Sequence, residues 1–84
     1  MKKSEIINIF ENGTQLLDWA IDTNEFGDLE SNGGREFLVA FENNYYLIQT
    51  TWNEEPFSGS KIFKKDFDED DELIKVINEY EKGL

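Results

Sequence analysis

The sequence predicts an α+β fold in one domain: an N-terminal helix, an antiparallel β-hairpin or three-stranded sheet, and an amphipathic C-terminal helix. The 84 residues are enough for one domain, residues 1–84, and too few for two. The middle of the chain is rich in β-branched and aromatic residues, whereas apolar residues recur at helical spacing toward both ends. The seven Phe, three Tyr and two Trp can fill a small core. Both helices are therefore expected to pack on the sheet.

The N-terminal segment allows two interpretations. We favour one helix from about Ser4, its N-cap, to Asp22, because seven apolar residues follow a helical stripe: Ile6, Ile9, Phe10, Leu16, Leu17, Ala20 and Ile21. However, Asn12-Gly13 is a turn signal inside that stripe. In the alternative interpretation the helix ends there, and residues 14–22 form a strand whose inward side chains are Leu17, Trp19 and Ile21.

A hairpin is predicted in the middle of the chain. Residues 23–35 are expected to form a loop, because Asn32-Gly33-Gly34 is a strong turn signal. Residues 36–42 and 45–52 read as strands joined by Asn43-Asn44, since Asn tolerates the positive φ of two-residue loops. The resulting cross-strand pairs on the core face are Phe37–Thr50, Val39–Ile48 and Phe41–Tyr46. The same register places Arg35 opposite Trp52, where a cation–π contact would form.

The last third of the chain predicts a loop, a strand and a helix. Residues 53–60 form the loop, and residues 60–65 form a third strand around Ile62 and Phe63. The helix starts with Asp68 as N-cap, carries the acids of residues 69–72 in its first turn, and ends at Gly83. Its expected buried face consists of Leu73, Val76, Ile77 and Tyr80.

Several function classes are excluded because the chain has no histidine and no cysteine. Zinc sites of the usual kind, disulfides, and serine–histidine or cysteine–histidine catalysis all need those side chains. We therefore expect no enzyme, no metal and no cofactor. No apolar run approaches the ~18 residues of a membrane span, and Glu5 and Glu11 interrupt the segment after Lys2 and Lys3, which is unlike a signal peptide. A cytoplasmic protein is expected.

The strongest local feature is an acid run, defined here as the six acids within residues 66–72: Asp66, Asp68, Glu69, Asp70, Asp71 and Glu72. The run begins like a calcium-binding EF-hand loop, but its sixth position is Asp71 rather than Gly and its twelfth is Ile77 rather than Glu. Two or three acids suffice to stabilise a helix N-terminus. The excess indicates a second role.

Charge is distributed unevenly over the whole chain. With 19 acids and 8 bases, the net charge is −11, beyond the magnitude of ~2–8 that is ordinary for a small domain. Arg35 is the sole base between Ser4 and Ser60. Direct binding to nucleic acid is therefore not expected, and the matching partner is a basic, nucleic-acid-binding protein. The carboxylates expected to contact it, besides the acid run, are Glu25, Asp28, Glu30, Glu54 and Glu55.

Trp52 and Phe57 flank the acidic loop that contains Glu54 and Glu55. Aromatic residues of small domains mostly belong to the core, so the composition favours both as caps on the core. The alternative places Trp52 in the partner-binding surface as an apolar anchor, because buried aromatics dominate interface energetics.

In size and charge the chain resembles small phage-encoded anti-CRISPR and other anti-defence proteins, which are often short, single-domain and strongly acidic. The acid run and the base-poor residues 4–60 carry this resemblance, which covers the whole chain as composition and includes no shared motif. It implies an inhibitor that mimics DNA charge and blocks a CRISPR effector or other defence nuclease inside a bacterial host cell. The alternatives are an immunity protein for a basic nuclease toxin, and a small structural or regulatory domain whose acidity only confers solubility. Either a monomer or a homodimer fits the sequence.

Overall fold

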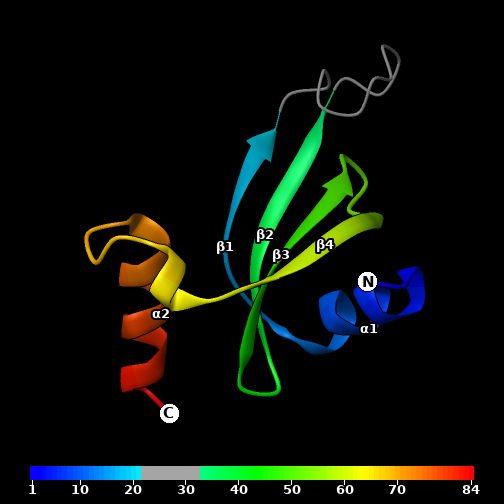
Figure 1. The fold of residues 1–84 in the computed structure, drawn as a ribbon. Coiled ribbons are helices and arrows are strands. Elements are labelled where there is room, and N and C mark those ends of the chain that lie inside the picture. Colours follow the sequence, from blue (N-terminus) through cyan, green and yellow to red (C-terminus); the bar gives the residue numbers. More distant parts are fainter. Residues whose placement is uncertain (22–32) are drawn as a thin grey trace.

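The computed structural model describes residues 1–21 and 33–84, which form a four-stranded antiparallel sheet between two helices. In Figure 1 helix α1 (Lys3–Asn12) and helix α2 (Glu72–Lys82) lie on opposite sides of the sheet. The strands follow the order of the chain, β1-β2-β3-β4, so each pairs with its neighbour in sequence. The predicted α+β class is confirmed, with four strands in place of two or three.

Helix α1 is shorter than we favoured, and the alternative interpretation of residues 14–22 is correct. The helix ends at Asn12, and strand β1 (Thr14–Ile21) follows Gly13 directly. A Cβ at Gly13 would lie 2.4 Å from Val39 Cγ1 and 2.6 Å from the carbonyl oxygen of Ile9. Glycine therefore lets the chain leave the helix and enter the sheet within one residue.

Burial along β1 alternates as a strand requires. Leu17, Trp19 and Ile21 are half-buried, whereas Asp18 and Ala20 between them are exposed. The predicted N-cap also moves, because α1 begins at Lys3 with Lys2 as its N-cap and Ser4 lies inside the helix.

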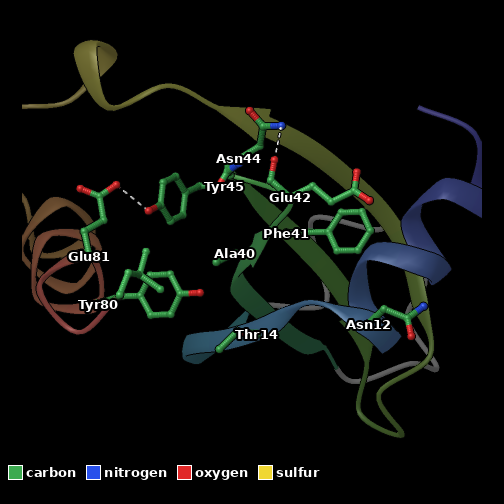
Figure 2. A pocket seen from close by; sticks show the side chains of 11 residues that line it. Asn12, Thr14, Ala40, Phe41, Glu42, Asn44, Tyr45, Tyr80 and Glu81 are labelled. Carbon is green, nitrogen blue, oxygen red and sulfur yellow. Dashed lines mark hydrogen bonds between the residues drawn. The ribbon is translucent and has the colours of Figure 1, made fainter.

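Strands β2 (Gly34–Phe41) and β3 (Asn44–Thr51) form the predicted hairpin, but the turn lies one residue earlier. Glu42 and Asn43 are the two loop residues, with φ of 49° and 66°, the pair of positive values that a type I′ turn requires. The side-chain amide of Asn44 donates to the Glu42 carbonyl at 3.2 Å (Figure 2). The turn therefore uses Glu42-Asn43 in place of Asn43-Asn44.

This shift changes the cross-strand partners by two residues and leaves the faces unchanged. Phe37 pairs with Ile48 and Val39 with Tyr46, so the predicted core-face residues still lie together. The predicted pairing of Arg35 with Trp52 is wrong. Arg35 lies opposite Thr50, and its guanidinium forms an ion pair with Asp18 on β1.

Strand β4 (Pro56–Ile62) begins and ends earlier than predicted. The expected loop over residues 53–60 and strand over residues 60–65 are wrong, because most of that loop belongs to β4. Pro56 is the first residue of this edge strand, a position where its missing N–H costs no internal sheet bond. After β4, a single 3₁₀ turn, η2 (Lys64–Asp66), leads toward α2.

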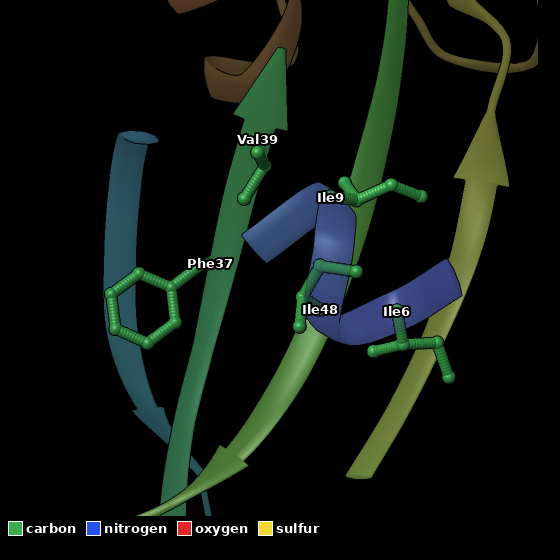
Figure 3. Packing of buried hydrophobic residues seen from close by; sticks show 5 residues of the cluster. All are labelled: Ile6, Ile9, Phe37, Val39 and Ile48. Carbon is green, nitrogen blue, oxygen red and sulfur yellow. The ribbon is translucent and has the colours of Figure 1, made fainter. Parts of the chain in front are cut away.

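One face of the sheet packs against α1. Figure 3 shows Ile6 and Ile9 of the helix facing Phe37, Val39 and Ile48 of the central strands. All five are buried, and half-buried aromatics surround them: Phe10, Phe41 and Tyr46. The ring centroids of Phe10 and Phe37 are 5.0 Å apart in an edge-to-face arrangement.

The opposite face packs against α2, where Leu38 meets Ile74 and Ile77. Leu38 and Ile77 have no exposed surface. The predicted helix face is correct for Leu73, Val76 and Ile77, but it omitted Ile74, which is more deeply buried than Tyr80. The predicted end of the helix at Gly83 is confirmed.

The two α-helices in the described part of the chain span ten and eleven residues. Neither is long and apolar enough to cross a lipid bilayer.

Candidate functional site

The turn between β3 and β4 has a well-defined backbone. We call residues 52–55 the Trp52 turn. The Glu54 N–H donates to the Thr51 carbonyl at 2.9 Å, and the Thr51 N–H donates to the Glu55 carbonyl at 3.1 Å. The Glu55 N–H reaches the Thr51 hydroxyl at 3.2 Å. Glu54 adopts a positive φ of 60°, which is uncommon outside glycine, so these bonds fix a conformation that the residue alone would rarely adopt.

This turn presents an aromatic side chain and two carboxylates to solvent. Trp52 is 47% exposed, and Glu54 and Glu55 are exposed as well. Phe57, just inside β4, is 38% exposed. The interpretation of Trp52 and Phe57 as caps on the core is therefore wrong, because the turn extends past the end of the sheet where neither helix covers it (Figure 1).

The acid run lies before α2 and only partly inside it. Helix α2 begins at Glu72, and its N-cap is Asp71, whose carboxylate accepts the Leu73 N–H at 2.8 Å. The predicted N-cap at Asp68 and the predicted first turn over residues 69–72 are wrong. Asp66 belongs to η2, and the acids between η2 and the N-cap are all exposed: Asp68, Glu69 and Asp70.

The helix therefore uses two of the six acids of the run, Asp71 as cap and Glu72 in the first turn. Of the other four, Asp66 lies in η2, and Asp68, Glu69 and Asp70 lie between η2 and the N-cap of α2. The start of α2 therefore contains two acids in place of the five that the sequence predicts there.

The structure does not bring all the predicted partner-binding residues together. The Trp52 turn precedes the first residue of β4, and the acid run follows the other end of that seven-residue strand, about 20 Å along it. Figure 1 shows the acid run beside α2. Glu25, Asp28 and Glu30 lie outside the described residues. The remaining predicted residues form two separate acidic regions, the Trp52 turn and the acid run.

Few carboxylates are neutralised. Within residues 1–21 and 33–84, three ion pairs form: Asp18–Arg35, Glu81–Lys64 at 2.8 Å and Glu79–Lys82 at 3.6 Å. Arg35, the single base of residues 4–60, is thus already engaged. The exposed carboxylates of the Trp52 turn and of the acid run take part in none of these three ion pairs.

Sequence reasoning missed a cavity of about 480 Å³ between the β2–β3 turn and the C-terminal end of α2. Figure 2 shows Tyr45 reaching across from β3 to Glu81 of α2. The Tyr45 hydroxyl donates to Glu81 Oε2 at 2.6 Å, and Lys64 Nζ lies 2.8 Å from Glu81 Oε1. No local signal marks these residues, because 45, 64 and 81 meet only through the tertiary fold.

The shifted pKa values of Tyr45 and Glu81 favour a structural link between these residues over acid–base chemistry. Burial, together with the hydrogen bond to the Glu81 carboxylate, raises the pKa of Tyr45 to about 12. The hydrogen bonds from Lys64 and then Tyr45 lower the pKa of Glu81. At neutral pH the Tyr45 phenol stays protonated and the Glu81 carboxylate stays charged. Glu81 therefore links α2 to β3 through Tyr45 and to η2 through Lys64.

The part of the chain that the structure describes contains no group of three or more acidic side chains arranged to hold a metal ion. The acid run is thus an extended series of solvated carboxylates and not a cage of oxygen ligands.

Comparison with protein-family models, with curated proteins and with solved structures found no match.

Proposed function

We propose that this chain is an acidic inhibitor that binds a basic, nucleic-acid-binding protein, such as a CRISPR effector or another defence nuclease. By occupying the basic surface with carboxylates in the place of phosphates, it blocks access of the nucleic acid. The observation that carries the proposal is the Trp52 turn, where an exposed tryptophan stands beside two exposed carboxylates on a hydrogen-bonded backbone.

The turn has the chemistry of an interface anchor. Tryptophan is enriched among the residues that dominate binding energy, and it loses little conformational entropy when buried by a partner. The bonds from Thr51 hold the turn in one conformation before binding, which reduces the ordering cost of association. Glu54 and Glu55 supply charges that pair with lysine or arginine around the tryptophan.

The acid run supports the same partner chemistry over a longer range. Asp66, Asp68, Glu69 and Asp70 carry charge that neither α2 nor a base of the described residues neutralises. Together with the net charge of −11, they accelerate encounter with a basic partner and make that encounter sensitive to salt.

The first experiment is a tagged pull-down from bacterial lysate, washed at low and then high salt, with bound proteins identified by mass spectrometry. The expected result is one basic nucleic-acid-handling protein that is released by added DNA or RNA. A partner that nucleic acid cannot displace would favour an immunity-type contact. The absence of any specific partner at all salt concentrations would leave solubility as the explanation of the acidity.

Variants locate the contact once the partner is purified. Trp52→Ala combined with Glu54→Gln and Glu55→Gln is expected to weaken binding at least tenfold, because a hot-spot residue contributes about 2 kcal/mol or more. The control is the double variant Glu5→Gln with Glu11→Gln, which removes an equal number of negative charges from exposed positions on α1. Equal losses in both variants would mean that the turn has no specific role.

A further inference from the structure

A basic aromatic patch interrupts the acidic surface where β4 passes into η2. Phe63 is 48% exposed, and two ammonium groups lie near its ring, Lys61 Nζ at 5.2 Å and Lys65 Nζ at 5.8 Å from the centroid. We call these three residues the Phe63 patch. Neither lysine forms an ion pair with a carboxylate in residues 1–21 or 33–84. Two positive charges thus lie over an exposed ring, and neither has a carboxylate partner among the described residues.

The patch borders a shallow cavity of about 360 Å³. Its other side is lined by Asn43 of the β2–β3 turn and by Asn44 and Tyr45 at the start of β3. Glu81 also borders this cavity, but its carboxylate is already held by Lys64 and Tyr45. The volume is within the range of small-ligand sites, and the charge left for a ligand is positive.

The combination of groups has a specific chemical complement. A flat, exposed aromatic ring offers a stacking platform for a nucleobase. Lysine ammoniums bind phosphate as point charges, and their flexible stems let them turn from the ring to a ligand. The side-chain amide of Asn43 offers donors and an acceptor to the polar edge of a base. The Asn44 amide, which gives one N–H to the Glu42 carbonyl, keeps its second N–H and its oxygen. We propose that the Phe63 patch and its cavity bind a nucleotide, with the base on Phe63 and the phosphate at Lys61 and Lys65.

The nucleotide is a free one and not part of a strand. Asp66 follows Lys65 directly and Asp68 lies two residues further, both exposed. The additional phosphates of an oligonucleotide would approach these carboxylates and the net charge of −11, whereas a mononucleotide places its single phosphate at the lysines. This site is independent of the proposed inhibitor function, since it uses neither the Trp52 turn nor the acid run as contacts.

The test is a titration of ¹⁵N-labelled protein with adenosine monophosphate at low ionic strength, followed by amide chemical shifts. The shifts are expected to concentrate in residues 43–45 and 61–65. Ribose 5-phosphate, which lacks the base, is expected to bind about tenfold more weakly because stacking is lost. A short oligothymidylate is expected to bind more weakly than the mononucleotide.

Matched variants make the outcome decisive. Phe63→Leu keeps an apolar side chain without the planar ring, and Lys61→Gln with Lys65→Gln removes the phosphate contacts; both are expected to abolish the localised shifts. The controls are Phe57→Ala, an exposed phenylalanine at the other end of β4, and Lys75→Gln, an exposed lysine on α2. The amide spectrum of each variant reports whether it is folded.

Three results would overturn the assignment. They are scattered or absent shifts with adenosine monophosphate, full binding by the Phe63→Leu variant, and equal binding of ribose 5-phosphate. Tighter binding of the oligothymidylate than of the mononucleotide would overturn the choice of a free nucleotide. None of these results bears on the inhibitor proposal, whose variants lie in the Trp52 turn.

Discussion

Glu81 links the stability of the fold to acid pH. Its carboxylate accepts hydrogen bonds from Lys64 and Tyr45, and these bonds hold its pKa below the ordinary value of 4.5. A depressed pKa in the folded state adds stability above the pKa of the unfolded chain. That stability is lost as the pH falls through the lowered pKa of the folded protein.

We predict that Glu81→Gln reduces the free energy of unfolding at neutral pH and flattens its decline below pH 4.5. Urea midpoints measured across that pH range check this. The control is Glu79→Gln, which removes a carboxylate from an exposed ion pair on the same helix and is expected to change the profile little. An unchanged acid profile in Glu81→Gln would contradict the prediction.

Gly13 is required for space and not for an unusual backbone angle, since its φ of −80° is open to any residue. We predict that Gly13→Ala costs about 1–3 kcal/mol, because the new Cβ would press on Val39 and on the Ile9 carbonyl. Chemical denaturation measures the cost. Gly83→Ala is the matched control, as its Cβ would meet only the Tyr80 carbonyl, at an ordinary 3.6 Å.

At the start of α2, one acidic residue caps the helix and the acidic residue before it does not. We predict that Asp71→Ala costs about 1 kcal/mol, because the Leu73 N–H loses its acceptor. Asp70→Ala, one residue earlier, removes the same charge without removing a cap and is expected to be near neutral or stabilising. Thermal unfolding of both variants gives the comparison, and equal losses would place Asp70 in the helix start.

Elements whose pattern is local could be predicted from the sequence. The β2–β3 hairpin and α2 each carry a period that neighbouring residues alone define. β1 could not be separated from a helix, because its apolar residues fit both periods and the decisive contact, Gly13 against Val39, lies across the sheet. The hairpin register failed by two residues because Glu42, an unusual residue at positive φ, takes the place expected for Asn44.

The sequence indicates which residue types make up the candidate site, but not how they are arranged in space. The sequence predicts Glu54 and Glu55 on a partner-binding surface and favours Trp52 as a core residue, with a place on that surface as the alternative. The exposure of all three follows from where β3 and β4 end. The Phe63 patch and the Tyr45–Glu81 link depend on which elements meet in space. Contacts between elements that are distant in the chain produce no periodic pattern in a single sequence.

For the molecule as a whole, the main electrostatic feature is repulsion among the excess carboxylates that give the chain its net charge of −11. We predict that sodium chloride raises the melting temperature, because screening weakens this repulsion more than it weakens the few exposed ion pairs. A gain of about 1 kcal/mol would appear as about 4–8 °C for a domain of this size. Differential scanning calorimetry over a salt series measures it.

The control for the salt effect is the triple variant Asp68→Asn, Glu69→Gln and Asp70→Asn, which removes three negative charges outside the helix. It is expected to start from a higher melting temperature and to gain less from salt. A melting temperature that falls with salt would show that ion pairs such as Asp18–Arg35 outweigh the repulsion.

The strand order has a consequence for how the protein is made. Because β1 to β4 are neighbours both in the chain and in the sheet, a ribosome can release each strand next to the one that it pairs with. Helix α1 is synthesised before the strands and can cover its face as soon as the central strands emerge. The face around Leu38 stays bare until residues 72–82 leave the exit tunnel. Premature termination before α2 would therefore yield a sheet with one exposed apolar face, which chaperones and proteases would recognise.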